Sequence, residues 1–271
     1  MLKCDKILNI NNEFIGVIIL KKQRLAQMAD FISQKSTVTL SELADKFGVT
    51  IFTVRRDVEE LVDKGIVKKF YGGVSFNNNS VATLVEFEGR NTIHHEQKLR
   101  IAKAVAQEIE DNDVIFIDAG TTTMYISDYI KDKKLTVFTN NIYVIIKLFL
   151  QENINLFVIG GELDHRTKSL FGLNALRFLD NITIHKAFLG TSGISLENGF
   201  TNYTFSESEI KSKVIGISKK SYILADTSKF DKPSMIRFAR FEDISCIATC
   251  KTIPQKYIDY SNKNKIEIIY G

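Results

Sequence analysis

Five short apolar segments in the middle of the chain each end in a small or polar residue, and this repeated pattern constrains the fold strongly. Helical stretches separate the segments. Apolar strands that alternate with helices indicate a mainly parallel sheet with helices on its faces. We therefore expect an α/β domain over residues 95–271. The segments VIFI, LTVFT, INLFVI, KAFL and SYILA lead into Asp118, Asn140, Gly161, Gly190 and Asp226.

The stretch DAGTTT, residues 118–123, is the most informative of these strand ends. In parallel sheets, ligands bind at the edge formed by the carboxyl ends of the strands. Gly120 lets a ligand approach the backbone, and the threonines Thr121, Thr122 and Thr123 offer hydroxyl groups. The N–H groups that open the following helix favour an anion. These features predict a site for a phosphorylated small molecule, although an ordinary helix cap would also explain GTTT.

Nucleotide-binding signatures are absent from the sequence. It contains neither G-x-x-x-x-G-K-[ST] nor G-x-G-x-x-G, so neither a Walker loop nor an NAD site is expected. The three cysteines, Cys4, Cys246 and Cys250, are odd in number and lack paired spacing, which fits a reducing compartment. The four histidines show no metal-ligand spacing. We expect no metal and no cofactor.

The N-terminal third shows helical spacing of apolar residues over residues 21–76. Thr39 followed three residues later by Glu42 has the form of a capping box, so a helix should begin there and end at Gly48. A second helix should begin after Thr50 and stop at Gly65. Two helices joined by a tight turn that contains glycine predict a helix-turn-helix.

The outward face of the second helix is basic. If Val54 and Val58 are buried, the side chains of Phe52, Thr53, Arg55 and Arg56 project away from the core. An arginine at such a position can bind guanine or neutralise a phosphate. The net charge of +4 is too small for the whole molecule to attract a polyanion, so any basic function must be local. The alternative is a solvated basic face on a helical bundle.

The stretch IVKKFYGGV predicts a hairpin that acts as a wing, with Lys68 and Lys69 within reach of a DNA backbone. The stretch FIGVIIL, residues 14–20, is too short to span a bilayer, and no cleavage site follows it. We therefore expect a cytoplasmic protein that does not associate with membranes. Residues 1–20 precede every recognisable feature, and we interpret them as an N-terminal extension upstream of the native start.

These stretches carry a resemblance to a known family. TLSELADKFGVTIFTVRRDVEELVDKGIVKKFYGGV resembles the winged helix of the DeoR family of bacterial regulators. EQKLRIA, DAGTTT, TNN, FLGTSGI, NGFT and DTSKF resemble that family's sensor domain, which is related in fold to ribose-5-phosphate isomerase. The resemblance implies an α/β chain with a winged helix-turn-helix over residues 21–76, a connector over residues 77–94 and a mainly parallel sensor domain over residues 95–271.

The resemblance also implies partners and site residues. Double-stranded operator DNA and a phosphorylated sugar effector are the expected partners, and paired half-sites favour a homodimer or homotetramer. The expected DNA contacts are Thr50, Phe52, Thr53, Arg55, Arg56, Lys68, Lys69 and Tyr71. The expected effector contacts are Asp118, Gly120, Thr121, Thr122, Thr123, Asn140, Gly161, Lys211 and Lys229.

Five positions depart from the family pattern, and two of them, Val54 and Val58, are mild exchanges of core residues. Lys69 stands where the family usually has arginine, and Tyr71 stands where it usually has histidine. His185 replaces an aspartate. If that aspartate contacts effector hydroxyls, the choice of effector differs in this chain; alternatively, His185 is a strand-end residue with no role in ligand binding.

The leading interpretation is a DNA-binding transcriptional regulator, a repressor of a sugar-metabolism operon controlled by a phosphorylated sugar. One alternative is a sugar-phosphate isomerase with a DNA-binding head. Isomerisation needs a carboxylate base, but FLGTSGIS contains no acid and nothing in the sequence pairs Glu207 with Asp226. A second alternative is a regulator with a degenerate pocket that senses no ligand.

Overall fold

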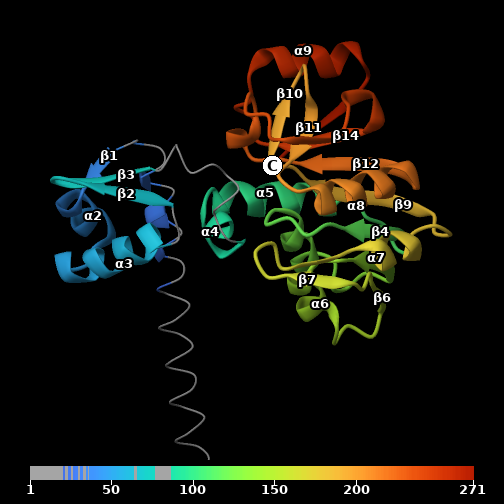
Figure 1. Cartoon of the computed structure of the whole chain (residues 1–271), viewed down its shortest axis with the longest axis horizontal. Helices are drawn as coiled ribbons and strands as arrows, with labels where there is room; N and C mark the ends of the chain where they lie inside the picture. Colours follow the sequence, from blue (N-terminus) through green and yellow to red (C-terminus); the bar gives the residue numbers. More distant parts are fainter. Residues whose placement is uncertain are drawn as a thin grey trace, which may run out of the picture. The chain divides into compact units, whose positions relative to one another are not determined.

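The computed structural model describes residues 21, 24–25, 27–29, 31–32, 35, 37–63, 66–76 and 87–271. The chain divides into two compact units, with the boundary along the sequence between His95 and Glu96 (Figure 1). Residues 1–20, the expected helix stop at Gly65 and the first ten residues of the expected connector lie outside the described residues.

The first unit contains the predicted helix pair and hairpin. A three-stranded antiparallel sheet of order β1-β3-β2 accompanies them. The short strand β1 was not predicted, because SQKSTV has the composition of a turn and the strand exists only through its pairing with β3. The described elements are β1 (Thr37–Thr39), α2 (Leu40–Phe47), α3 (Ile51–Asp63), β2 (Val67–Phe70), β3 (Gly73–Phe76) and α4 (Phe87–Thr92).

Local capping fixes the helix boundaries as predicted. The Thr39 hydroxyl accepts the backbone N–H of Glu42 at 3.2 Å, and the Glu42 carboxylate accepts the backbone N–H of Thr39 at 2.8 Å. Gly48 ends α2 in the left-handed conformation with φ of 61°, which glycine adopts without steric cost. Thr50 then accepts the backbone N–H of Thr53 at 3.2 Å and opens α3. The capping box and the glycine stop are therefore confirmed.

An ion pair joins Asp57, a buried residue of α3, to the half-buried Arg24. Asp57 is 1% exposed although it lies among apolar residues of the core. Arg24 donates Nε–H to one Asp57 oxygen at 2.6 Å and Nη2–H to the other at 3.2 Å. These hydrogen bonds raise the pKa of the Arg24 guanidinium. Asp57 therefore has a structural role.

We predict that Asp57→Asn destabilises the first unit by about 1.5–3 kcal/mol, the usual contribution of a hydrogen bond to a charged group. Hydrogen exchange of peptides from residues 37–63 in the full chain measures the change. Glu59→Gln is the matched control, because the Glu59–Lys69 pair is exposed and should contribute less than about 1 kcal/mol. Equal effects of the two substitutions would contradict the structural role of Asp57.

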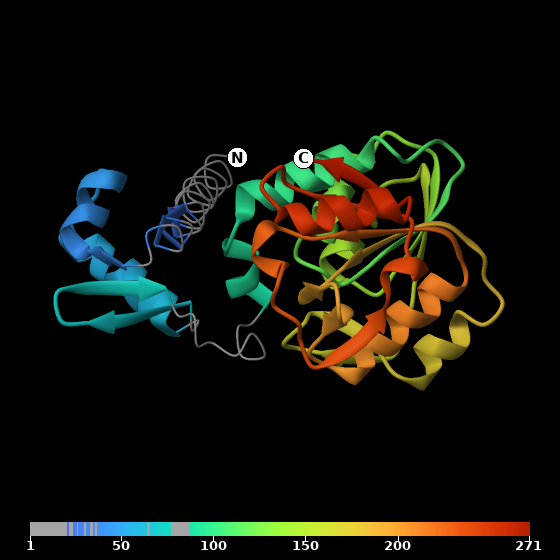
Figure 2. The same ribbon diagram turned by 90° about the horizontal axis from the view of Figure 1, so that it is seen from above.

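The second unit is built on a seven-stranded parallel sheet of order β15-β14-β12-β9-β4-β5-β6. This confirms the expected parallel α/β architecture. Figure 2 shows α5 and α9 on one side of the sheet and α7 and α8 on the other. The strands are β4 (Val114–Ile117), β5 (Leu135–Thr139), β6 (Ile154–Val158), β9 (Ile184–Gly190), β12 (Ser218–Leu224), β14 (Cys246–Thr249) and β15 (Glu267–Tyr270).

Helices and two small antiparallel sheets complete this unit. One small sheet has the order β10-β11-β13 and the other pairs β7 with β8. The helices are α5 (His95–Ala106), α6 (Ile142–Leu148), α7 (Leu173–Phe178), α8 (Phe205–Gly216) and α9 (Gln255–Lys263), with 3-10 turns η1 (Thr123–Asp128), η2 (Thr227–Lys229) and η3 (Phe241–Asp243). The remaining strands are β7 (Glu162–Asp164), β8 (Ser169–Phe171), β10 (Gly193–Ser195), β11 (Gly199–Asn202) and β13 (Ile236–Ala239).

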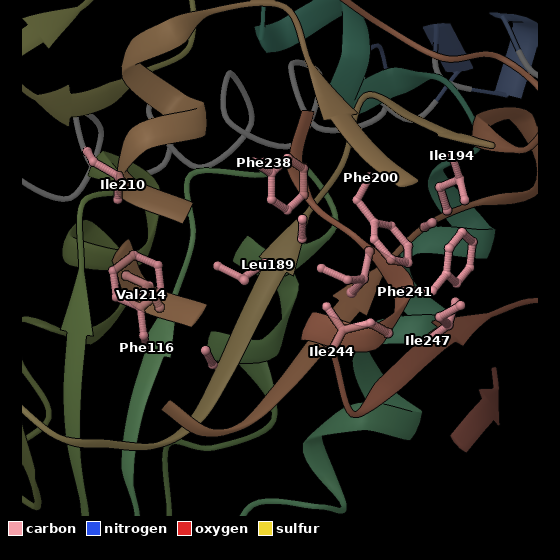
Figure 3. Packing of buried hydrophobic residues seen from close by; sticks show 14 of the residues in the cluster. Phe116, Leu189, Ile194, Phe200, Ile210, Val214, Phe238, Phe241, Ile244 and Ile247 are labelled. Atoms are coloured by element: carbon pink, nitrogen blue, oxygen red, sulfur yellow. The ribbon is translucent and has the colours of Figure 1, made fainter. Parts of the chain in front are cut away.

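One apolar cluster packs α8 and the small sheet β10-β11-β13 against the large sheet (Figure 3). Phe116 and Leu189 come from the central strands, and Val214 comes from α8. Phe200 and Phe241 come from the small sheet and from η3, with ring centroids 4.7 Å apart. All five side chains are at most 2% exposed, so this cluster holds the carboxyl ends of the strands in fixed positions.

The strand order places a topological switch point between β4 and β9. From β4 the chain adds β5 and β6 in one direction, and it then returns to add β9, β12, β14 and β15 in the other. At such a point the segments that leave the two central strands diverge and open a crevice at the carboxyl edge. The stretch DAGTTT follows β4 directly, so it lies at this switch point.

Candidate functional site

The structure brings the five polar strand ends to one edge of the sheet. Five neighbouring strands are parallel, in the order β12, β9, β4, β5 and β6. The residues at or just after their carboxyl ends therefore lie in the same order along one edge of the sheet. We call this edge the ligand rim. Its members, in spatial order, are Asp226, Gly190, Asp118, Asn140 and Gly161.

The centre of the ligand rim is a buried ion pair. The Asp118 carboxylate lies 3.1 Å from Lys211 Nζ, and the two residues are 2% and 3% exposed. The same Asp118 oxygen accepts the N–H of Gly190 at 3.0 Å, and Lys211 donates to the Gly190 carbonyl at 2.7 Å. The pair therefore binds both backbone groups of Gly190, the last residue of β9, and ties this residue to Asp118 after β4 and to Lys211 of α8. Asp118 and Lys211 were both predicted to contact effector, and the structure directs their charges at each other.

The GTTT loop divides its threonines between two roles. The Thr123 hydroxyl accepts the N–H of Gly120 at 3.0 Å and lies 2.7 Å from the Asp118 carbonyl, to which it donates. Thr123 is fully buried, so its hydroxyl is used within the loop. For Thr121 and Thr122, by contrast, we find no hydroxyl hydrogen bond to the described part of the chain. The loop then enters a 3-10 turn rather than the α-helix that the sequence suggested.

The two asparagines of TNN also differ in role. Asn141 donates to the Asp118 carbonyl at 3.1 Å and accepts the N–H of Tyr143 at 2.9 Å, which caps α6. Asn140 donates to the Leu170 carbonyl at 3.1 Å, but its buried side-chain oxygen has no hydrogen-bond partner among the described residues. A buried acceptor without a partner costs about 1–3 kcal/mol. A ligand hydroxyl at the rim would remove that cost.

The outer parts of the ligand rim are defined by Gly161 and by the turn η2. A Cβ on Gly161 would lie 2.0 Å from the Phe171 carbonyl oxygen, so packing against β8 requires glycine there. Lys229, half-buried, ends η2, whose first turn is capped by Asp226 through the N–H of Ser228 at 3.0 Å.

Gln97 of α5 was not predicted as a rim residue. Its side-chain oxygen accepts the N–H of Thr227 at 3.3 Å and the Thr227 hydroxyl at 3.2 Å. The stretch EQKLRIA contains this residue, but only the tertiary structure reveals its partner.

His185 lies at the opposite edge of the sheet. It is the second residue of β9, and its Nδ1 accepts the backbone N–H of Val114 at 3.3 Å. Asp113 is 3.4 Å away. Burial opposes ionisation of Asp113, but the Glu110 N–H and the Lys186 ammonium together outweigh it and lower the pKa of the carboxyl. This position favours a structural role for His185 over effector recognition.

The predicted DNA contacts form an exposed surface of the first unit. Phe52, Arg55 and Arg56 on α3 are exposed, and Thr53 is half-buried against its capping partner Thr50. Tyr71 is fully exposed at the tip of the wing. The wing lysines are exposed too, with Lys69 paired to Glu59 of α3. Phe70 is also 48% exposed and was not predicted.

A separate cavity of about 250 Å³ lies beside the small sheet of the second unit. None of the predicted effector contacts lines it. Its charged residues balance, with two arginines and two glutamates, and all four are exposed. The lining residues are Leu196, Glu197, Gly199, Arg237, Arg240, Phe241, Glu242 and Tyr260.

A winged helix-turn-helix with exposed arginines, followed by an α/β unit with an anion-compatible rim, is typical of ligand-sensing DNA-binding regulators. Comparison with known families agrees. Residues 24–80 match the DeoR-like helix-turn-helix domain, and residues 93–251 match the DeoR C-terminal sensor domain. The chain therefore belongs to the DeoR family of regulators.

Several curated proteins are similar along most of the chain. The HTH-type transcriptional regulator IolR of Bacillus subtilis is 38% identical over 92% of this chain and 99% of its own length. The glycerol-3-phosphate regulon repressor of Escherichia coli is 27% identical over 91% and 97%. The lactose phosphotransferase system repressor of Staphylococcus aureus is 27% identical over 92% and 96%.

Among solved structures, ribose 5-phosphate isomerase A from Methanocaldococcus jannaschii matches 50% of this chain and 54% of its own, at 17% identity and a TM-score of 0.37. Within the described ranges, no helix is long and apolar enough to cross a membrane. The described residues also contain no group of three or more histidine, cysteine, aspartate or glutamate side chains placed to hold a metal ion.

We predict that Lys211→Met destabilises the second unit by about 3–5 kcal/mol, because Asp118 would remain buried and charged without a partner. Asp118→Asn combined with Lys211→Met should cost less than the sum of the single substitutions, with a coupling above about 1 kcal/mol. Chemical denaturation of the three variants and the wild type measures this cycle. Additive effects would show that the two groups do not stabilise each other.

Proposed function

We propose that this protein is a transcriptional repressor of a sugar-metabolism operon and that a phosphorylated sugar bound at the ligand rim controls its affinity for operator DNA. The observation that carries the proposal is that the GTTT loop and Asn140, whose buried side-chain oxygen has no hydrogen-bond partner among the described residues, follow the neighbouring strands β4 and β5 at the same edge of the sheet. The similar proteins named as repressors of a glycerol-3-phosphate regulon and of a lactose phosphotransferase system support the same conclusion.

In the proposed complex the rim residues fall into two groups. The hydroxyls of Thr121 and Thr122, with the backbone N–H groups of the loop, hold the phosphate. Asn140 accepts a hydrogen bond from a sugar hydroxyl, and Lys229 supplies positive charge. The residues Asp118, Gly120, Thr123, Gly161 and Lys211, all expected to touch effector, act in this proposal mainly as the frame that holds the loop in place.

The chemistry at the rim favours binding over catalysis. An isomerase needs a carboxylate poised at a sugar carbon. Glu207 instead accepts the Thr204 hydroxyl at 2.9 Å as part of the cap of α8. Asp226 caps η2 through Ser228. Both acids that could serve as a base are therefore engaged in local structure, which supports a sensor over an enzyme.

The proposed partners follow from the first unit. One winged helix reads one half-site, so a homodimer or homotetramer on a two-fold operator is the expected active form. Its place of action would be the cytoplasm, where the DNA and phosphorylated sugars are found. The arginines of α3 would contact bases, and the wing lysines would contact phosphates.

We predict that Arg55→Ala weakens binding to an operator duplex, selected by the wild-type protein from a random pool, by roughly 1–3 kcal/mol, because it removes a base contact. Binding of the wild type should weaken with salt, with a log–log slope of about −0.9 per neutralised phosphate. Fluorescence anisotropy at several salt concentrations measures both. Arg177→Ala, an exposed arginine of the second unit, is the control of equal charge. If the two variants bind alike, Arg55 makes no specific contact.

We predict that Thr122→Asp binds operator normally but no longer responds to effector. The new carboxylate would occupy the position of the phosphate and repel it. Gel-shift titration with a panel of phosphorylated sugars, and with the same sugars lacking phosphate, measures the release. Thr122→Ser keeps the hydroxyl and should respond like the wild type.

Thr122 is only 6% exposed, so a substitution there can also disturb folding. Thermal unfolding of each variant distinguishes misfolding from a loss of response to effector. A folded Thr122→Asp protein that is released at the wild-type effector concentration would show that the GTTT loop is only a cap. Release of the wild type by unphosphorylated sugars at equal concentrations would contradict a phosphate site.

A further inference from the structure

Phe52 presents an apolar side chain to solvent at the start of the recognition helix. It is the second residue of α3, and 71% of its surface is exposed. We find no aromatic or cation contact to Phe52 from the described residues. Most of this large aromatic side chain therefore contributes no buried surface to the described part of the first unit.

The position of Phe52 is opposite the core. Val54, Val58 and Leu61 are fully buried and define the inner face of α3. With 3.6 residues per turn, Phe52 and Arg56 fall one turn apart on the outermost face of the helix. The two side chains thus reach the same partner surface together.

The charge along α3 determines which part of the helix approaches DNA. Its first two turns contain Arg55 and Arg56, whereas its later turns contain the acids Glu59, Glu60 and Asp63. Lys69 pairs with Glu59, and Lys21 lies 2.6 Å from Glu60. Only the N-terminal half is suited to a polyanion, and that half contains Phe52.

From this placement we infer that Phe52 reads thymine through its C5-methyl group. This inference rests on the proposed DNA-binding function and adds the base chemistry of one contact. In the major groove the thymine methyl is the apolar group that a phenyl ring can contact, whereas arginine binds guanine. Phe52 and Arg56 are about 6 Å apart along the helix axis. The thymine therefore lies within about two base-pair steps, of 3.4 Å each, from the guanine that Arg56 contacts.

The test uses duplexes that the full-length wild-type protein selects from a random 30-base-pair pool. Each thymine is replaced in turn by uracil, which lacks the methyl group, and each guanine by 7-deazaguanine, which lacks the N7 acceptor. We expect uracil at one position in each half-site to weaken wild-type binding about fourfold, the effect of burying roughly one CH₂ group. Phe52→Ala should bind both duplexes alike, and Phe52→Leu should retain part of the preference. Phe205→Ala, which removes an aromatic side chain of similar exposure (70%) from the second unit, should keep the uracil effect in full.

Specific outcomes overturn the inference. It fails if uracil is neutral everywhere for the wild type, or if Phe52→Ala keeps the uracil effect. Replacing one guanine by 7-deazaguanine should weaken binding of the wild type but not of Arg56→Ala, which identifies the guanine that Arg56 contacts. The inference also fails if the uracil-sensitive thymine lies more than about two base-pair steps from that guanine. A Phe52→Ala protein that only changes its oligomeric state would assign Phe52 to a protein contact instead. If no sequence is enriched at all, the proposed function fails rather than this contact alone. Circular dichroism and thermal unfolding confirm folding of each variant.

Discussion

The buried ion pair between Asp118 and Lys211 lies where the two halves of the parallel sheet meet, and the geometry of the ligand rim depends on it. At the switch point the chain leaves β4 and β9 in different directions. The Asp118 N–H still donates to the Phe188 carbonyl of β9 at 3.0 Å, and the ion pair adds side-chain bonds to Gly190 of the same strand. The carboxylate accepts the Gly190 N–H and the ammonium donates to the Gly190 carbonyl. Burying two charges is unfavourable unless such hydrogen bonds accompany the pairing. Because they do, the loop that follows Asp118 starts from a fixed point.

The sequence predicts those parts of the fold that depend on local chemistry. Thr39, Glu42 and Gly48 specify the ends of α2 through contacts within a few residues, and the structure reproduces them. The parallel sheet was predictable because strands buried on both faces are apolar along their whole length. The small sheet β10-β11-β13 and strand β1 were not predicted. Strand β1 pairs with β3 and strand β13 pairs with β11, and in both cases the partner is distant in sequence.

The same division applies to the candidate site. The position of the rim follows from the strand ends, but the role of each side chain depends on partners far along the chain. Lys211 lies 93 positions after Asp118 in the sequence, so the pairing of the two residues could not be predicted from their spacing. Thr123 and Thr122 are neighbours with the same chemistry, yet only Thr123 has its hydroxyl used within the loop. Only a structure separates the frame from the residues left to bind a ligand.

Under the proposed function, effector binding changes the affinity for DNA, and the size of this change is limited by the free energy that contacts at the ligand rim contribute. Gln97 is the second residue of the second unit, and it accepts two hydrogen bonds from Thr227 at the rim. A rearrangement of that turn therefore acts on the segment next to the first unit. Moving a two-state equilibrium from 1:99 to 99:1 takes about 5.5 kcal/mol of differential binding. Two neutral hydrogen bonds contribute about 1 kcal/mol each. Contacts of Gln97 alone are too weak for a complete switch, so under the proposed function most of the differential affinity would have to come from the effector itself.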